Sequence, residues 1–107
     1  MSTEKLSEAD VRAKGLVDWV IEDQMLRTRW RTGDFATGLR LLNLIGHAAE
    51  AADHHPDLDL RYPHLDVALT SHDVGGLTER DVLMARQISD LAEREGVVAA
   101  PRDVGSD

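Results

Sequence analysis

The alternation of apolar and polar positions predicts two β-hairpins, the first between residues 18 and 32. Asp23-Gln24 should form its turn. One face of the strand that follows carries apolar or hydroxylated side chains: Leu26, Thr28, Trp30 and Thr32. The other face carries arginines: Arg27, Arg29 and Arg31. Such a face could hold an anion, but alternation by itself predicts a solvated strand face, which we favour.

The second hairpin follows Pro56 and shows the same two-residue period. Its apolar positions are Leu58, Leu60 and Tyr62 on the first strand and Leu65, Val67 and Leu69 on the second. The tetrapeptide Tyr-Pro-His-Leu, residues 62–65, should turn the chain between them.

Three- and four-residue spacing of apolar side chains predicts helices in the rest of the chain. The longest should start after Asp34 as N-cap and leave helical geometry near His55, because Pro56 disfavours that geometry at the preceding residue. Its expected core stripe is Phe35, Leu39, Leu42, Ile45 and Ala49.

Capping boxes mark the starts of two further helices. Ser7 and Asp10 begin a short one that should end near Gly15. Thr78 and Asp81 begin the last one, which should end at Gly96. The apolar face of this last helix consists of Val82, Ala85, Ile88 and Leu91.

The order helix, two strands, helix, two strands, helix predicts an α+β fold: a four-stranded antiparallel sheet with three helices on one face. We expect residues 1–96 to form a single domain and residues 97–107 to form a flexible C-terminal tail. The other face of the sheet must then be solvated or covered by another subunit.

Composition narrows the classes of function. The 107 residues carry a formal charge of -8, the wrong sign for direct nucleic-acid binding or for an anionic membrane surface. The absence of cysteine excludes disulfides and thiolate nucleophiles. With no basic-apolar leader and no membrane-length apolar run, we expect a soluble cytoplasmic protein.

Histidine is the residue type here that exchanges protons near neutral pH. His54 and His55 close the long helix and His72 closes the last strand, so the three rings could converge at one rim of the fold. Glu50 precedes His54 by four residues and could orient its ring. Asp81 either completes the capping box or supports a histidine.

A metal site is the alternative. His47, Glu50 and His54 share one helical face and could supply two imidazoles and a carboxylate to iron or zinc, although a compact site would need a further element. A serine nucleophile is disfavoured because Ser71 and His72 are adjacent strand positions that face opposite ways. The chain also has no glycine-rich phosphate loop.

One longer pattern combines these residues: an acid, three residues, His-His-Pro, five residues, an aromatic, nine residues, a histidine, and a later aspartate. It is formed by Glu50, His54-His55-Pro56, Tyr62, His72 and Asp81. In this pattern the chain resembles the pterin-4a-carbinolamine dehydratases. The resemblance extends from Leu6 to Gly96 through Leu6-Ser7, Trp19, Asp34-Phe35 and residues 76–81. It departs at Leu58, where some members carry tryptophan.

The resemblance implies a hydro-lyase that removes water from a 4a-hydroxytetrahydropterin to give the quinonoid dihydropterin in tetrahydrobiopterin recycling. It implies a pterin as small-molecule substrate, no cofactor and no metal, and a homodimer or homotetramer. The implied general acids are His54 and His72, and His55 would bind and orient the pterin. Asp53, Thr70 and Ser71 would flank the substrate, and Glu50 and Asp81 would support the site.

A second class of function is open to the same fold. Some family members are dimerisation cofactors of a homeodomain transcription factor, and degenerate ones are Rubisco assembly factors. Those roles use helix surfaces and need no complete histidine set, so the complete motif favours the enzyme.

Overall fold

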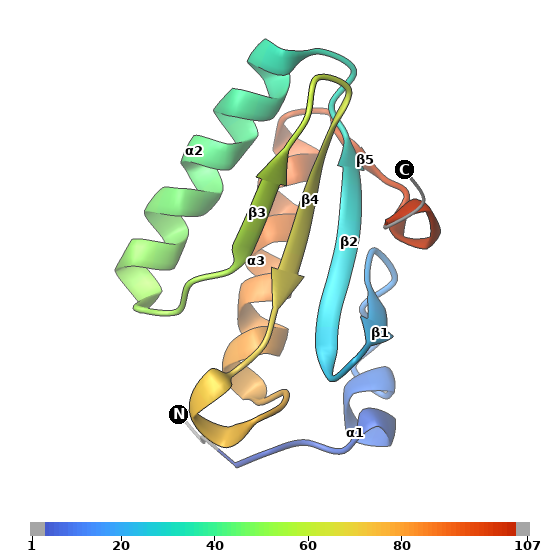
Figure 1. The fold of residues 1–107 in the computed structure, drawn as a ribbon, viewed down its shortest axis with the longest axis vertical. Coiled ribbons are helices and arrows are strands. Elements are labelled where there is room, and N and C mark those ends of the chain that lie inside the picture. Colours follow the sequence, from blue (N-terminus) through green and yellow to red (C-terminus); the bar gives the residue numbers. More distant parts are fainter. Residues whose placement is uncertain (1–3, 105–107) are drawn as a thin grey trace.

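Two long helices pack on one face of an antiparallel sheet (Figure 1), which confirms the α+β class. The computed structural model describes residues 4–104. The elements in chain order are α1 (Glu8–Arg12), β1 (Val20–Glu22), β2 (Met25–Arg31), α2 (Phe35–Ala52), β3 (Asp57–Leu60), β4 (His64–Leu69), the 3-10 turn η1 (His72–Val74), α3 (Glu79–Arg94), β5 (Val98–Ala99) and the 3-10 turn η2 (Pro101–Asp103). The sheet order is β1-β2-β4-β3, with β5 also paired to β2.

Both expected hairpins form. Asp23 and Gln24 have positive φ values of 52° and 61°, which suits a two-residue loop whose twist matches that of its strands. In the second hairpin the N–H of Arg61 donates to the carbonyl of His64 at 2.9 Å, so His64 already belongs to β4 rather than to the turn. The central pair, β2 and β4, then runs from Leu26 opposite Leu69 to Arg31 opposite His64.

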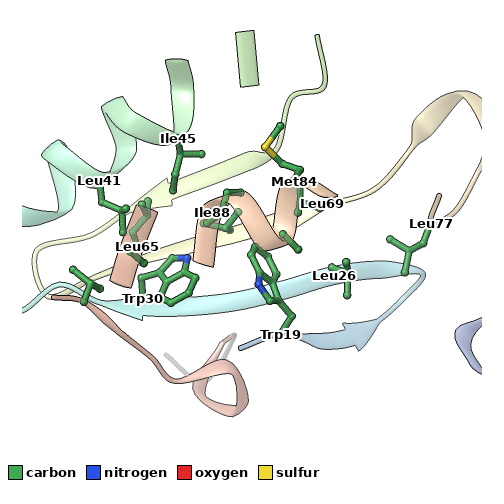
Figure 2. Close-up of a cluster of buried hydrophobic side chains, with 14 of the residues drawn as sticks. Trp19, Leu26, Trp30, Leu41, Ile45, Leu65, Leu69, Leu77, Met84 and Ile88 are labelled. Carbon is green, nitrogen blue, oxygen red and sulfur yellow. The ribbon is translucent and has the colours of Figure 1, made fainter. Parts of the chain in front are cut away.

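The core fills the layer between the sheet and the two long helices (Figure 2). Trp30, Leu65 and Ile88 are almost completely buried there. Trp19 meets Trp30 edge to face, with 6.2 Å between ring centroids.

The buried stripe of α2 is rotated from the expected one. Phe35 and Leu39 are 47% and 43% exposed, so their prediction as core residues is wrong. The buried positions are Gly38, Leu41, Ile45 and Ala49. Gly38 explains the rotation, because a Cβ there would lie 2.7 Å from Cδ1 of Leu60, so its face lies against β3. No helix within residues 4–104 is long and apolar enough to cross a membrane.

The arginine face of β2 is not solvated at its centre. Arg29 is only 6% exposed and forms a two-pronged ion pair with Asp66, at 2.8 and 3.0 Å. Arg27 pairs with Glu22 and Arg31 with Asp103. The expectation of a solvated face is therefore wrong at Arg29, since periodicity does not reveal what lies above a sheet.

The covering segment is the one expected to be a flexible tail. In residues 97–104, β5 pairs with Trp30 and Arg31, the part of the β2 edge that β1 leaves unpaired. The N–H of Ala100 donates to the carbonyl of Arg29 at 2.7 Å. The strand consists only of Val98 and Ala99, which is too short a stretch for an alternation pattern to predict. Residues 105–107 lie outside the described part of the chain.

Substitution Ala100→Pro is expected to lower the free energy of unfolding by about 1–3 kcal/mol, because proline removes the donor and leaves the Arg29 carbonyl without it. Urea denaturation measures the change. Ala100→Ser keeps the N–H and should stay within about 0.5 kcal/mol of the parent. Equal stability of the two variants would show that the docked segment adds nothing to the fold.

Candidate active site

His54 and His55 follow the C-terminal end of α2, and the backbone there directs their side chains to different surroundings. Asp53 adopts the left-handed conformation, with φ 51° and ψ 43°, which short polar side chains tolerate better than most. The chain therefore reverses, and the N–H of His54 donates to the carbonyl of Ala49 at 3.1 Å. His54 turns into the protein and is buried, whereas His55 is exposed.

The partner of His54 lies on another helix. Its Nε2 is 2.6 Å from Oδ1 of Asp81, in the first turn of α3. Asp81 is completely buried, so this contact joins the end of α2 to the start of α3 away from bulk water. Glu50, which the sequence offered as the partner of His54, instead contacts Nε2 of His55 on the exposed surface.

Asp81 also completes the capping box of α3. Its Oδ2 accepts from the backbone N–H of Thr78 at 2.9 Å and from the hydroxyl of Ser71 at 2.7 Å. The Ser71 and Thr78 hydroxyls are 2.9 Å apart, and both residues are almost fully buried. One carboxylate oxygen of Asp81 therefore completes the helix cap, and the other contacts His54.

His72 lies next to this network but not on the strand. β4 ends at Leu69, and His72 opens η1, so the expectation that it closes the strand is corrected. Ser71 and Gly76 form a bridge that closes the η1 loop. Because Ser71 binds Asp81, the ends of α2 and β4 meet at one end of the molecule (Figure 1). The ring of His72 is exposed there.

The remaining candidates occupy the surface around η1 and the end of α2. The Thr70 hydroxyl donates towards the carbonyls of Gln24, at 3.1 Å, and Gly76, at 3.3 Å, so it ties the first hairpin to the η1 loop. Asp53 is exposed. Ser71 is different, because its hydroxyl faces Asp81 in the interior and the residue is only 1% exposed.

Sequence reasoning missed the residues that frame this network. Arg80 donates to Asp73 at 2.7 Å and, through Nε, to the Thr78 hydroxyl at 3.2 Å. The hydrogen bond from Arg80 holds the pKa of Asp73 below its ordinary value against opposing desolvation, and the positive charge of Arg80 adds to this effect. The basic residue inside the capping sequence Thr-Glu-Arg-Asp was the available signal.

The metal alternative finds no support in this arrangement. Within residues 4–104 no group of three or more histidine and acidic side chains could hold a metal ion. The three residues of that alternative also point to different surroundings: His54 contacts Asp81, Glu50 contacts His55, and His47 is exposed.

Comparison with known proteins places the chain among sequences of one kind. The family described as pterin 4 alpha carbinolamine dehydratase matches residues 4–91. A Chloroflexus aurantiacus protein named "Putative pterin-4-alpha-carbinolamine dehydratase" is 39% identical over 90 residues, covering 81% of this chain and 96% of that protein. One of the same name from Metallosphaera sedula is 37% identical over 86 residues, covering 80% and 90%.

Solved structures agree on the fold. A crystal structure titled transcriptional coactivator/pterin dehydratase, from Brucella melitensis, superimposes with a TM-score of 0.79 at 29% identity, covering 83% of this chain and 99% of that one. A pterin dehydratase-like protein described as a RuBisCO assembly factor in the alpha-carboxysome gives 0.58 at 19% identity, over 69% and 86%. The second likeness concerns the fold alone.

Proposed function

Because the chain belongs to the pterin-4a-carbinolamine dehydratase family, we propose that it is a hydro-lyase that converts a 4a-hydroxytetrahydropterin into the quinonoid dihydropterin. The observation that carries this proposal is the buried contact of His54 with Asp81. It links two parts of the histidine motif that stand 27 residues apart and gives one imidazole a fixed, charged partner. A family member with only a scaffolding role would not need that contact.

The reaction requires two proton transfers. The carbon-oxygen bond breaks as the departing hydroxyl receives a proton and leaves as water, and a carbon-nitrogen double bond forms as the neighbouring ring nitrogen loses its proton. Imidazoles suit both steps because their two protonation states coexist near neutral pH. We assign these transfers to His54 and His72, and the binding and orientation of the pterin to the exposed His55.

Alanine substitutions test the assignment. His54→Ala and His72→Ala are each expected to slow dehydration of a freshly generated 4a-hydroxytetrahydropterin by roughly 10²–10⁴-fold, the usual contribution of a general acid or base. His55→Ala should mainly raise KM. His47→Ala removes an exposed histidine from α2 and serves as the control, for which we expect unchanged kinetics. Parental rates in all three site variants would refute the proposal.

A non-catalytic role as a dimerisation or assembly cofactor is the second candidate, and it would use a helix surface such as that of α2. Phe35 and Leu39 are both exposed and stand four residues apart, so they lie on one side of this helix. We propose that this side of α2 takes part in a homodimer or homotetramer. Light scattering tests the assembly: the parent should have the mass of a dimer or tetramer, and Leu39→Glu should have a lower mass. If the dissociated variant turned over at the parental rate, the assembly would not be required for catalysis.

A further inference from the structure

We infer that Ser71 and Thr78 are positioning residues that act through Asp81 to hold His54 in a single tautomer, with its proton on Nε2 and Nδ1 left as its reactive nitrogen. This inference rests on the proposed function for its consequence in catalysis. Its structural content, the tautomer, stands on the hydrogen bonds alone.

The chain of donors begins at Arg80, which can only donate. Both its backbone N–H and its Nε lie 3.2 Å from the Thr78 hydroxyl oxygen, so that oxygen acts as acceptor for both. The one hydroxyl proton of Thr78 is then free to point to Ser71, whose oxygen is 2.9 Å away. Ser71 in turn directs its proton to Oδ2 of Asp81 at 2.7 Å.

The series of hydrogen bonds ends at the Asp81 carboxylate, whose Oδ2 only accepts. Oδ2 of Asp81 receives two donors, the Ser71 hydroxyl and the backbone N–H of Thr78, so it carries no proton of its own. The carboxylate also lies in the first turn of α3, where the helix dipole favours negative charge. Every hydrogen bond around Asp81 is therefore satisfied when the side chain is ionised.

An ionised Asp81 decides the protonation of His54. Its Oδ1 is 2.6 Å from Nε2 and can only accept, so the imidazole must place a proton on Nε2. In the neutral ring Nδ1 is then the unprotonated atom. A substrate proton can be exchanged only through Nδ1, while Asp81 stabilises the imidazolium that forms.

This direction of the hydrogen bonds argues against the role that the family resemblance implied for Ser71, which was to contact the substrate. Its hydroxyl proton is committed to Asp81 and its oxygen accepts from Thr78. With 1% of the residue exposed, its side chain has no surface to offer a pterin. Ser71 thus affects the reaction only through the orientation and protonation of His54.

The test combines imidazole NMR with kinetics. Long-range ¹H–¹⁵N spectra at about pH 8, where an ordinary imidazole is neutral, should show His54 of the parent protein only as the Nε2–H tautomer. Ser71→Ala removes one of the two donors that hold the Asp81 carboxylate in its orientation towards Nε2 of His54. The variant should therefore give a mixture of tautomers and a roughly ten-fold or larger fall in kcat, the size expected when a hydrogen bond to a charged group is lost. KM should change less than about two-fold, because this residue does not touch substrate.

Two further variants make the result specific. Ser71→Thr retains the hydroxyl and should restore both the single tautomer and kcat. Thr28→Val removes another fully buried hydroxyl, one that donates to the carbonyl of Asp18, and should change neither. An Nδ1–H tautomer in the parent protein, or a parental tautomer and kcat in Ser71→Ala, would overturn the inference. If the parent shows the expected tautomer but no dehydratase activity, the proposed function fails and the tautomer assignment survives.

Discussion

Replacing Asp66 with alanine is expected to lower the free energy of unfolding by about 3–5 kcal/mol, because it removes the two-pronged carboxylate partner of the buried Arg29 guanidinium. The two side chains are only 7% and 17% exposed. The effect should appear as a lower midpoint in urea denaturation with an unchanged slope. Among the stability changes expected of single substitutions, this is the largest that we derive.

The chain supplies a matched control. Arg61 and Asp59 form an ion pair with the same Nε–Oδ1 distance of 2.8 Å as Arg29 and Asp66, but their side chains are 60% and 56% exposed. Asp59→Ala should cost at most about 1 kcal/mol, since water replaces the lost partner. Equal costs for the two substitutions would show that burial does not make the Arg29 pair different.

The double variant Arg29→Met/Asp66→Leu separates the cost of burying Arg29 without Asp66 from the net contribution of the ion pair to stability. Replacing both charges with apolar side chains of similar volume is often neutral or stabilising in a buried pair. We therefore expect this variant to recover most of the stability lost in Asp66→Ala. A loss as large as that of the single variant would mean that the ion pair itself contributes strongly to folding.

Local features of the fold were predictable because their causes are local. Asp23-Gln24 formed the expected tight turn, and Ser7 with Asp10 and Thr78 with Asp81 formed the expected capping boxes. These features depend on backbone preferences and on side chains within three residues of one another. The sequence contains all of that information in a short window.

The features that were missed depend on contacts between distant segments. Phe35 and Leu39 fit the helical period as well as Leu41 does, and only the approach of Leu60 to Gly38 decides which face is buried. Arg29 looks solvated until the chain beyond Gly96 returns along β2. A two-residue or 3.6-residue period shows which side chains share one face of a strand or helix, but it does not show which segment packs against that face.

The candidate site shows the same division. The histidine motif was evident from spacing alone, yet the spacing of four residues favoured Glu50 as the partner of His54. The left-handed Asp53 turns His54 away from its own helix and towards Asp81. The orientation of a side chain at a helix end thus depended on one backbone conformation that no periodicity encodes.

Substitution Asp81→Asn is expected to reduce the dehydration rate by roughly 10²–10⁴-fold in a protein that still folds, the same range as removal of the His54 imidazole itself. The amide oxygen should replace Oδ2, because the N–H of Thr78 and the hydroxyl of Ser71 both need an acceptor there. The amide nitrogen then faces Nε2 of His54 and donates to it, so the neutral ring must carry its proton on Nδ1. Nδ1, the nitrogen through which His54 is proposed to exchange the substrate proton, is thereby blocked.

Asp10 provides the control, since it holds the same third position in the capping box of α1 but contacts no histidine. Asp10→Asn should show parental turnover, whereas Asp81→Asn should show the Nδ1–H tautomer by NMR together with a kcat that falls more than KM changes. If Asp81→Asn lost only stability and turned over at the parental rate while folded, Asp81 would be a helix cap and nothing more. Parental turnover accompanied by the Nδ1–H tautomer would place the proton transfers on other groups. The first to consider would be His72, which is exposed and is the first residue of η1, next to Ser71.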